Sequence, residues 1–158
     1  MVRDRERAQR AHRLSEGARR WRLYETRNGK VPKDLVRMFA EMPTPQIARS
    51  PRPFLTDRER GTLSEVLGFI DRHGARKLLS VVDVAEEASP AIRKVTAVRG
   101  SLFELKIQSG QHNPRFLFVL CNDAVVFLAA FAKKTQKLRR VDVARAADRF
   151  QTMKDECE

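Results

Sequence analysis

The residues that could do chemistry in this chain gather in its second half, and most of them are cationic. Glu104 and Lys106 alternate with apolar residues in "LFELKIQ", and Arg115 opens the segment "RFLFVLC". A basic cluster follows "AVVFLAAFA" and contains no acidic residue: Lys133, Lys134, Lys137, Arg139 and Arg140. Because acidic groups suit a helix N-terminus, a following helix does not explain this cluster. The cluster either lies on a surface that has no binding function or binds an anion.

Strand order brings these groups within reach of one another. In consecutive antiparallel strands, the start of one strand lies beside the end of the next, so Arg115 and Lys133 or Lys134 can converge. Glu104 and Lys106 share one face of the preceding strand. One interpretation is an exposed sheet edge with a Glu–Lys pair and a solvated basic end. The other is an anion-binding site, and the pattern leaves both open.

The familiar catalytic signatures are missing from the sequence. It has no glycine-rich phosphate loop, no CxxC, no HExxH and no nucleophile elbow. Its three histidines, His12, His73 and His112, do not have the spacing of metal ligands. We therefore expect neither a metal nor a cofactor. His112, in the loop "SGQHNPR", is near enough to the basic strands to be considered as a catalytic or RNA-contacting group.

Bulk composition points to an anionic partner. The chain has 158 residues, enough for one domain, and a net charge of +12 that favours nucleic acid or an acidic protein. Its longest apolar stretch is interrupted by polar residues and is too short to span a bilayer, so no membrane partner is expected. Cys121 and Cys157 form no disulfide framework by their number and spacing, which favours the cytoplasm.

The first half predicts a basic arm, a strand and two helices. Residues 1–19 form the arm, and "WRLYET" reads as a strand followed by a helix in "PKDLVRMFAEM". Thr56 and Glu59 predict a capping box, and Gly74 predicts the end of that second helix. Its apolar stripe consists of Leu63, Val66, Leu67 and Ile70. For residues 75–98 the sequence allows two structures, a third helix or a strand-like variable insertion.

The second half predicts three antiparallel strands and a closing helix. Phe103, Leu105 and Ile107 alternate with polar residues, and a turn at 122–123 joins two strands that are apolar on both faces. "VDVARAADRFQTM" predicts a helix, with 154–158 as a tail. We therefore expect a small α+β domain over 20–153, with helices against one side of a mainly antiparallel sheet.

Four segments carry a resemblance to a known family. "WRLYETRNGK", "RGSLFELKIQSG", "PRFLFVL" and "FAKKTQKLRRVDVARAADR" resemble, in order and spacing, the phage-associated HigB-like branch of the RelE/ParE toxin superfamily. The resemblance covers about residues 20–153 and is most specific at "AFAKKTQK" and "RGxLxELxI". It implies a RelE-like α/β fold, in agreement with the predicted element order.

The resemblance implies a type II toxin that cuts messenger RNA in the ribosomal A site, without metal or cofactor. Expected partners are mRNA, the 30S subunit with its ribosomal RNA, and a helix-turn-helix antitoxin. Glu104 or Lys106 would stand where the superfamily has its general base, and Arg115 where it has a phosphate-stabilising arginine. Lys133 and Lys134 would supply a cation or acid. Further RNA contacts are expected from Arg99, His112, Gln136, Lys137, Arg139 and Arg140.

Two other functions fit the same residues. One is a non-catalytic ribosome- or RNA-binding protein that keeps the basic face without cleavage. The other is an accessory phage protein that uses the fold only for protein contacts. Incubation with translating ribosomes separates the enzyme from both.

Overall fold

The helices and strands occupy largely separate parts of the chain, as expected for an α+β domain: one strand and three helices come before four strands and a closing helix. The computed structural model describes residues 19–47, 49, 51–85, 87–95, 102–132 and 139–157. Its elements, in chain order, are β1 (Trp21–Leu23), α2 (Lys33–Met38), α3 (Asp57–His73), α4 (Ala75–Val81), β2 (Ala91–Lys94), β3 (Leu102–Lys106), β4 (Arg115–Cys121), β5 (Ala124–Phe131), α5 (Arg140–Met153) and the 3-10 helix η1 (Lys154–Cys157). The α+β prediction is confirmed.

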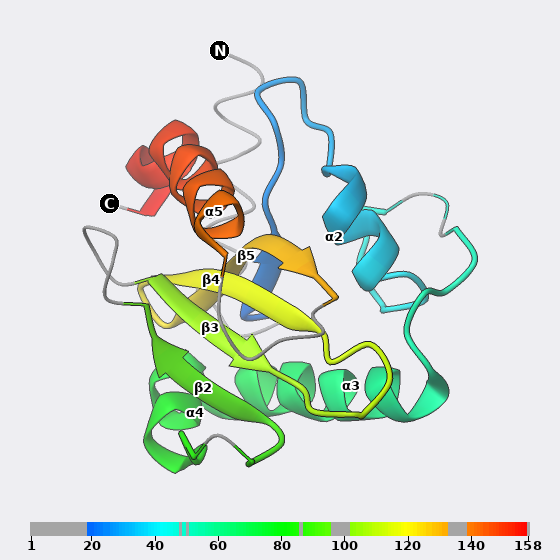
Figure 1. Ribbon diagram of the computed structural model, residues 1–158. Helices are drawn as coiled ribbons and strands as arrows, with labels where there is room; N and C mark the ends of the chain where they lie inside the picture. The colour runs from blue at the N-terminus through cyan, green and yellow to red at the C-terminus, as the bar shows by residue number, and fades with distance from the viewer. Residues whose placement is uncertain are drawn as a thin grey trace.

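A five-stranded mixed sheet forms the centre of the molecule, in the order β1-β5-β4-β3-β2 (Figure 1). Strands β2 to β5 make an antiparallel meander, and β1 joins β5 in parallel, with Trp21 opposite Val125. The sequence predicted three of the four meander strands. The fourth, β2, lies inside residues 75–98, which contain both a short helix and a strand.

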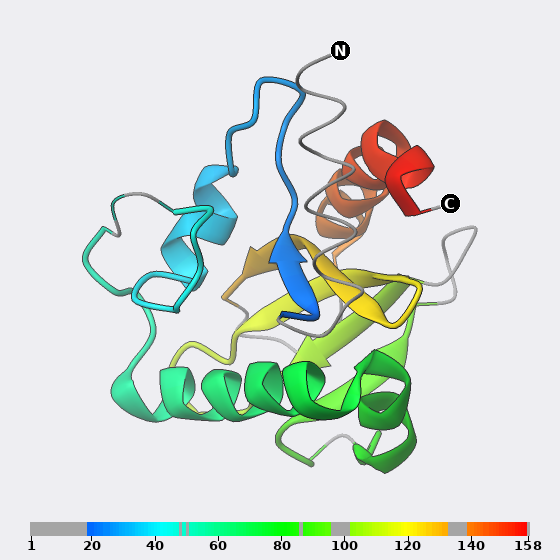
Figure 2. The ribbon, with the colours of Figure 1, turned by 180° about the vertical axis from the view of Figure 1, so that it is seen from behind.

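Helices cover both faces of the sheet, whereas the sequence predicted one covered side. Figures 1 and 2 show α3 and α4 on one face and α5 on the other. On the α3 side, the Phe39 ring packs against Trp21, Phe116 and Phe127. Strands β4 and β5 are buried along nearly their whole length, so each face needs its own cover. No helix in the described part of the chain is long and apolar enough to cross a membrane.

Both ends of α3 are fixed as the sequence predicted. The Thr56 hydroxyl accepts a hydrogen bond from the Glu59 amide, and the Glu59 carboxylate accepts one from the Thr56 amide. Gly74 ends the helix with φ +86°, and a Cβ there would lie 1.9 Å from Asp123 Oδ2. Glycine therefore permits α3 to close onto the β4–β5 turn, where the Ala75 amide donates to the Asp123 carbonyl oxygen.

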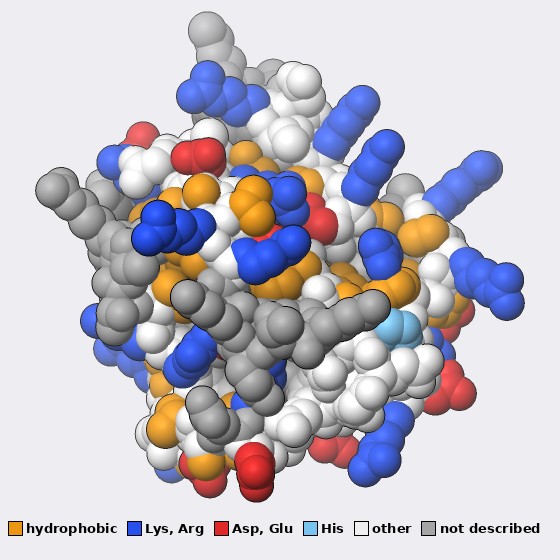
Figure 3. Space-filling model, in the orientation of Figure 1, with side chains coloured by type: hydrophobic (Ala, Val, Ile, Leu, Met, Phe, Trp, Pro, Cys, Tyr) orange, Lys and Arg blue, Asp and Glu red, His pale blue; other side chains and the backbone are white. Residues whose placement is uncertain are grey.

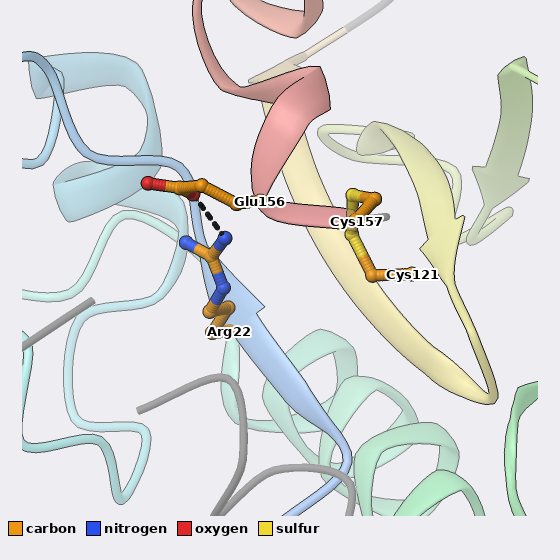
Figure 4. Close-up of a disulfide and its surroundings, with 4 residues drawn as sticks. All are labelled: Arg22, Cys121, Glu156 and Cys157. Carbon is orange, nitrogen blue, oxygen red and sulfur yellow. Dashed lines mark hydrogen bonds and ion pairs between the residues drawn. A yellow bond between two sulfur atoms is a disulfide. The ribbon is translucent and has the colours of Figure 1, made fainter. Parts of the chain in front are cut away.

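The two cysteines are joined, which corrects the expectation drawn from the sequence. Cys121 ends β4, Cys157 ends η1, and a disulfide links them across a Cα–Cα distance of 4.7 Å (Figure 4). Beside it, Arg22 Nη2 lies 2.7 Å from Glu156 Oε2. Because α5 runs back along the sheet, it brings η1 to the end of β4, although the cysteines are 36 residues apart. The cysteine argument for a cytoplasmic location therefore no longer holds.

Candidate active site

A small pocket opens on the α5 face of the sheet, where β2, β3 and β4 lie side by side. It has a volume of about 70 Å³, and its lining residues are Val84, Ala91, Ile92, Arg93, Glu104, Lys106 and Arg115. The strand register aligns the polar ones, because Arg93 pairs with Glu104 and Lys106 pairs with Arg115. Directly paired residues point to the same face of a sheet, so all four polar side chains share this face.

Glu104 is the centre of the polar cluster. Its Oε1 lies 2.9 Å from Arg93 Nε and 3.3 Å from Arg115 Nη1, so one carboxylate oxygen bridges two guanidinium groups. Glu104 is 1 % exposed and Arg115 4 %, whereas the Arg93 side chain is 50 % exposed. Within the described residues, Glu104 Oε2 is buried and accepts no hydrogen bond. One oxygen thus holds the carboxylate in place, and the other accepts no hydrogen bond from the described residues.

Cations outnumber carboxylates around this pocket. Arg93, Lys106 and Arg115 line it together with a single acidic residue, and Lys106 is only 5 % exposed. Burial lowers the pKa of the Arg115 guanidinium, Glu104 raises it, and the neighbouring Arg93 charge lowers it further. The positive charges of Arg93 and Arg115 repel each other, and an anion that binds near them reduces this repulsion. The pocket is therefore suited to a phosphate or another small anion.

The structure brings together three of the five residues predicted to be catalytic. Glu104, Lys106 and Arg115 meet in the pocket, but they are buried, so the interpretation as an exposed sheet edge is wrong. The added strand β2 explains this, because it extends the sheet beyond β3 and places Arg93 over Glu104. Arg115 pairs with Phe131, the last residue of β5, so β5 ends at the level of Arg115. Two predicted catalytic residues and three predicted RNA contacts lie outside the described residues: Lys133, Lys134, Arg99, Gln136 and Lys137.

His112 belongs to a different cluster, at the N-terminus of α3. Its Nδ1 lies 2.7 Å from Glu59 Oε1, and the second Glu59 oxygen accepts a hydrogen bond from the Ser109 hydroxyl. Burial raises the pKa of Glu59, but hydrogen bonds from His112, Ser109 and the Thr56 amide outweigh it and lower the pKa to about 2. His112 therefore joins the β3–β4 loop to α3 and does not line the pocket.

Arg139 and Arg140 remain on the surface at the start of α5. Arg139 Nε and Nη2 lie 2.9 and 3.2 Å from the two carboxylate oxygens of Asp142, which is 1 % exposed. Hydrogen bonding to Asp142 raises the pKa of Arg139. Figure 3 shows Lys and Arg side chains across the face that carries α5, with fewer Asp and Glu side chains among them.

Arg93 is the charged pocket residue that sequence reasoning missed. Its strand has four residues, and only Ala91 and Ile92 in it are buried, so its pattern is too short to predict a strand. The signal was the pair of charges Arg93 and Glu104, which becomes visible only when β2 and β3 are aligned. No group of three or more His, Cys, Asp or Glu in the described residues could hold a metal.

Comparison with known proteins gives one family. The model of the family "Phage derived protein Gp49-like (DUF891)" matches residues 67–151, more than half of the chain. The match includes every residue that lines the pocket, and also the stretch 75–98 that the sequence left open. No curated protein matches the chain.

Proposed function

Because the chain belongs to the phage-derived Gp49-like family, which is part of the RelE/HigB-like toxin family, we propose that it is a ribosome-dependent mRNA endoribonuclease. In this proposal it is the toxin of a type II toxin–antitoxin pair, in the HigB-like branch, and it arrests translation by cutting the message. The family supports a toxin of endoribonuclease type. One observation on the pocket supports the proposal that this chain cuts mRNA.

That observation is the Glu104 carboxylate bridged by Arg93 and Arg115 at the floor of a cationic pocket. RNA cleavage without a metal needs a base for the ribose 2′-hydroxyl and cations for the charge that develops on phosphorus. Glu104 Oε2 supplies the first requirement, and the surrounding guanidinium and ammonium groups supply the second. The other buried carboxylates of the described residues, Glu59 and Asp142, do not line this pocket.

The proposed reaction is an internal transesterification. Glu104 Oε2 takes the 2′-hydroxyl proton while the O2′–P bond forms and the P–O5′ bond breaks, and the departing 5′-oxygen takes a proton from an acid. Arg115 and Arg93 stabilise the phosphorane, and we assign Lys106 to the leaving oxygen as cation or acid. The products are a 2′,3′-cyclic phosphate and a 5′-hydroxyl.

Pocket size sets how the substrate binds. The pocket is small, about 70 Å³, and charged side chains form much of its lining, so it suits a phosphate group better than an apolar nucleobase. The message therefore lies over the pocket and inserts only its scissile phosphate. Arg93, the half-exposed partner of Glu104, is the side chain that can turn toward this phosphate and release Oε1. Ribosomal RNA and mRNA are the proposed partners of the basic surface, and a helix-turn-helix antitoxin is the proposed inhibitor.

Primer extension on ribosome-bound message tests the proposal. The protein should produce new 5′ ends only when ribosomes are present, and the upstream fragments should carry cyclic phosphate. Glu104→Gln keeps the shape of the side chain but removes the base, so cleavage should fall by about 100-fold or more. Glu65→Gln makes the same change on the exposed face of α3 and should cleave like the parent protein.

Two results would refute the enzyme. Intact message that stays bound to ribosomes would indicate the non-catalytic ribosome- or RNA-binding function. Full cleavage by folded Glu104→Gln would show that the bridged carboxylate is a structural ion pair and that the base lies elsewhere.

A further inference from the structure

Three side chains from distant segments stack into a column beside the N-terminus of α3. The Arg37 guanidinium carbon lies 3.6 Å from the centre of the Phe54 ring, over its face. The His112 ring lies against Phe54 with its centre 4.2 Å away and a tilt of 42°. Arg37 comes from α2, Phe54 from the segment before α3, and His112 from the β3–β4 loop. The fold therefore assembles this column from parts that no local motif connects.

The inner end of the column is fixed and its outer end is open. His112 is held by the buried carboxylate of Glu59, and Phe54 is half-buried. Arg37 is exposed, and among the described residues no carboxylate pairs with it. Within the described residues, its guanidinium group therefore has an aromatic ring beneath it and no carboxylate beside it.

Neighbouring charges extend this surface. Lys33 precedes Arg37 by one helical turn on α2, Arg52 lies two residues before Phe54, and both are exposed. Nucleobases stack on guanidinium planes and on aromatic rings, and lysine and arginine side chains contact the phosphates between them. An acidic protein segment would use the charges but would gain nothing from a planar stacking surface. Single-stranded nucleic acid uses both.

We propose that the Arg37–Phe54–His112 column is a stacking platform for a base of single-stranded RNA, with the base seated on the outer face of Arg37. This rests on the proposed function in so far as that function makes messenger RNA the ligand. The β3–β4 loop links the two sites, because it runs from Lys106 to Arg115 in the pocket and carries His112 in between. Arg37 and Phe54 lie outside the residues that the family model matches, so the family match does not predict this contact.

Fluorescence anisotropy with a short single-stranded 2′-O-methyl RNA tests the platform, because that RNA binds but offers no nucleophile for cleavage. Arg37→Gln and Phe54→Leu should each weaken binding about 5-fold or more, the loss of one stacked base. Arg145→Gln removes the same charge from the exposed face of α5 and should weaken binding less. An RNA with an abasic site, moved one position at a time, should lose affinity at one position, and Arg37→Gln should abolish that loss.

Equal weakening by Arg37→Gln and Arg145→Gln, or no position that responds to the abasic site, would overturn the platform and leave only general electrostatic attraction. Thermal unfolding checks that the variants are folded. Arg37→Gln, an exposed change, remains decisive if Phe54→Leu is unstable. Cleavage of ribosome-bound message is measured separately. If the parent protein cleaves the message and both stacking variants bind RNA normally, the protein is an enzyme without a platform. A platform without an enzyme shows the base-dependent binding and yields no cut message.

Discussion

Replacement of Arg115 by methionine should destabilise the fold mainly through the charge that it leaves behind. Glu104 is 1 % exposed and now bridges two guanidinium groups. Without Arg115 it would keep only the contact with the half-exposed Arg93. Removing one partner of a buried ion pair costs about 3–5 kcal/mol in the free energy of unfolding. For a chain of this size the melting temperature should fall by about 6–20 °C.

A double-mutant cycle measured by urea unfolding separates this effect from lost packing. Glu104→Gln alone leaves Arg93 and Arg115 facing each other without their shared carboxylate, and should also be destabilising. The double variant removes both members of the buried pair, so its loss should be smaller than the sum of the two single losses by about 1–3 kcal/mol. Arg145→Met, on the exposed face of α5, is the control and should change stability by less than about 0.5 kcal/mol. If the loss in the free energy of unfolding of the double variant equals the sum of the two single losses, Glu104 and Arg115 are not coupled and the prediction is refuted.

Three further predictions concern the parts that support the site. The pKa of Glu59 is lowered to about 2, so its contribution, roughly 3 kcal/mol, should be complete above pH 4.5 and disappear as the pH falls toward 2; urea unfolding of Glu59→Gln and the parent protein should therefore converge in acid. The disulfide closes a loop of 36 residues and should contribute about 4 kcal/mol, so a reducing agent should lower the melting temperature of the parent protein and leave that of Cys121→Ser unchanged. Leu67→Ala should cost about 2–5 kcal/mol by chemical unfolding because Leu67 is buried on α3, whereas Val81→Ala, at a position 53 % exposed, should cost less than about 0.5 kcal/mol.

Local signals in the sequence were sufficient for most of the elements. The capping box at Thr56 and the glycine at 74 located both ends of α3, and the turn at 122–123 located the β4–β5 hairpin, because each depends on residues a few positions apart. What could not be predicted depends on distant partners. The strand β2 is too short to show a period, and the Cys121–Cys157 pair requires knowledge of where α5 ends.

The candidate site also has a part that local sequence signals predict and a part that depends on distant partners. Alternation along β3 was enough to place Glu104 and Lys106 on one face, and strand order was enough to bring Arg115 to them. Burial of these charges was not predictable, because it follows from β2 on one side of β3 and β4 on the other. Arg93 was missed for the same reason. The stack on Phe54 joins α2 to the β3–β4 loop, and nothing in either segment alone indicates the other.

The parallel pairing of β1 with β5 has a consequence for the order in which the newly made chain can fold. Trp21 lies opposite Val125, so the ribosome must add about a hundred residues after β1 before its partner strand exists. At a synthesis rate of about 5–20 residues per second this interval lasts roughly 5–20 s. Throughout it, the apolar residues of β1 have no strand beside them, whereas β2, β3 and β4 can already pair because their pairings are local. A chain released before β5 is made would therefore end with its first strand unpaired and its β3–β4 pocket without the strand that borders β4.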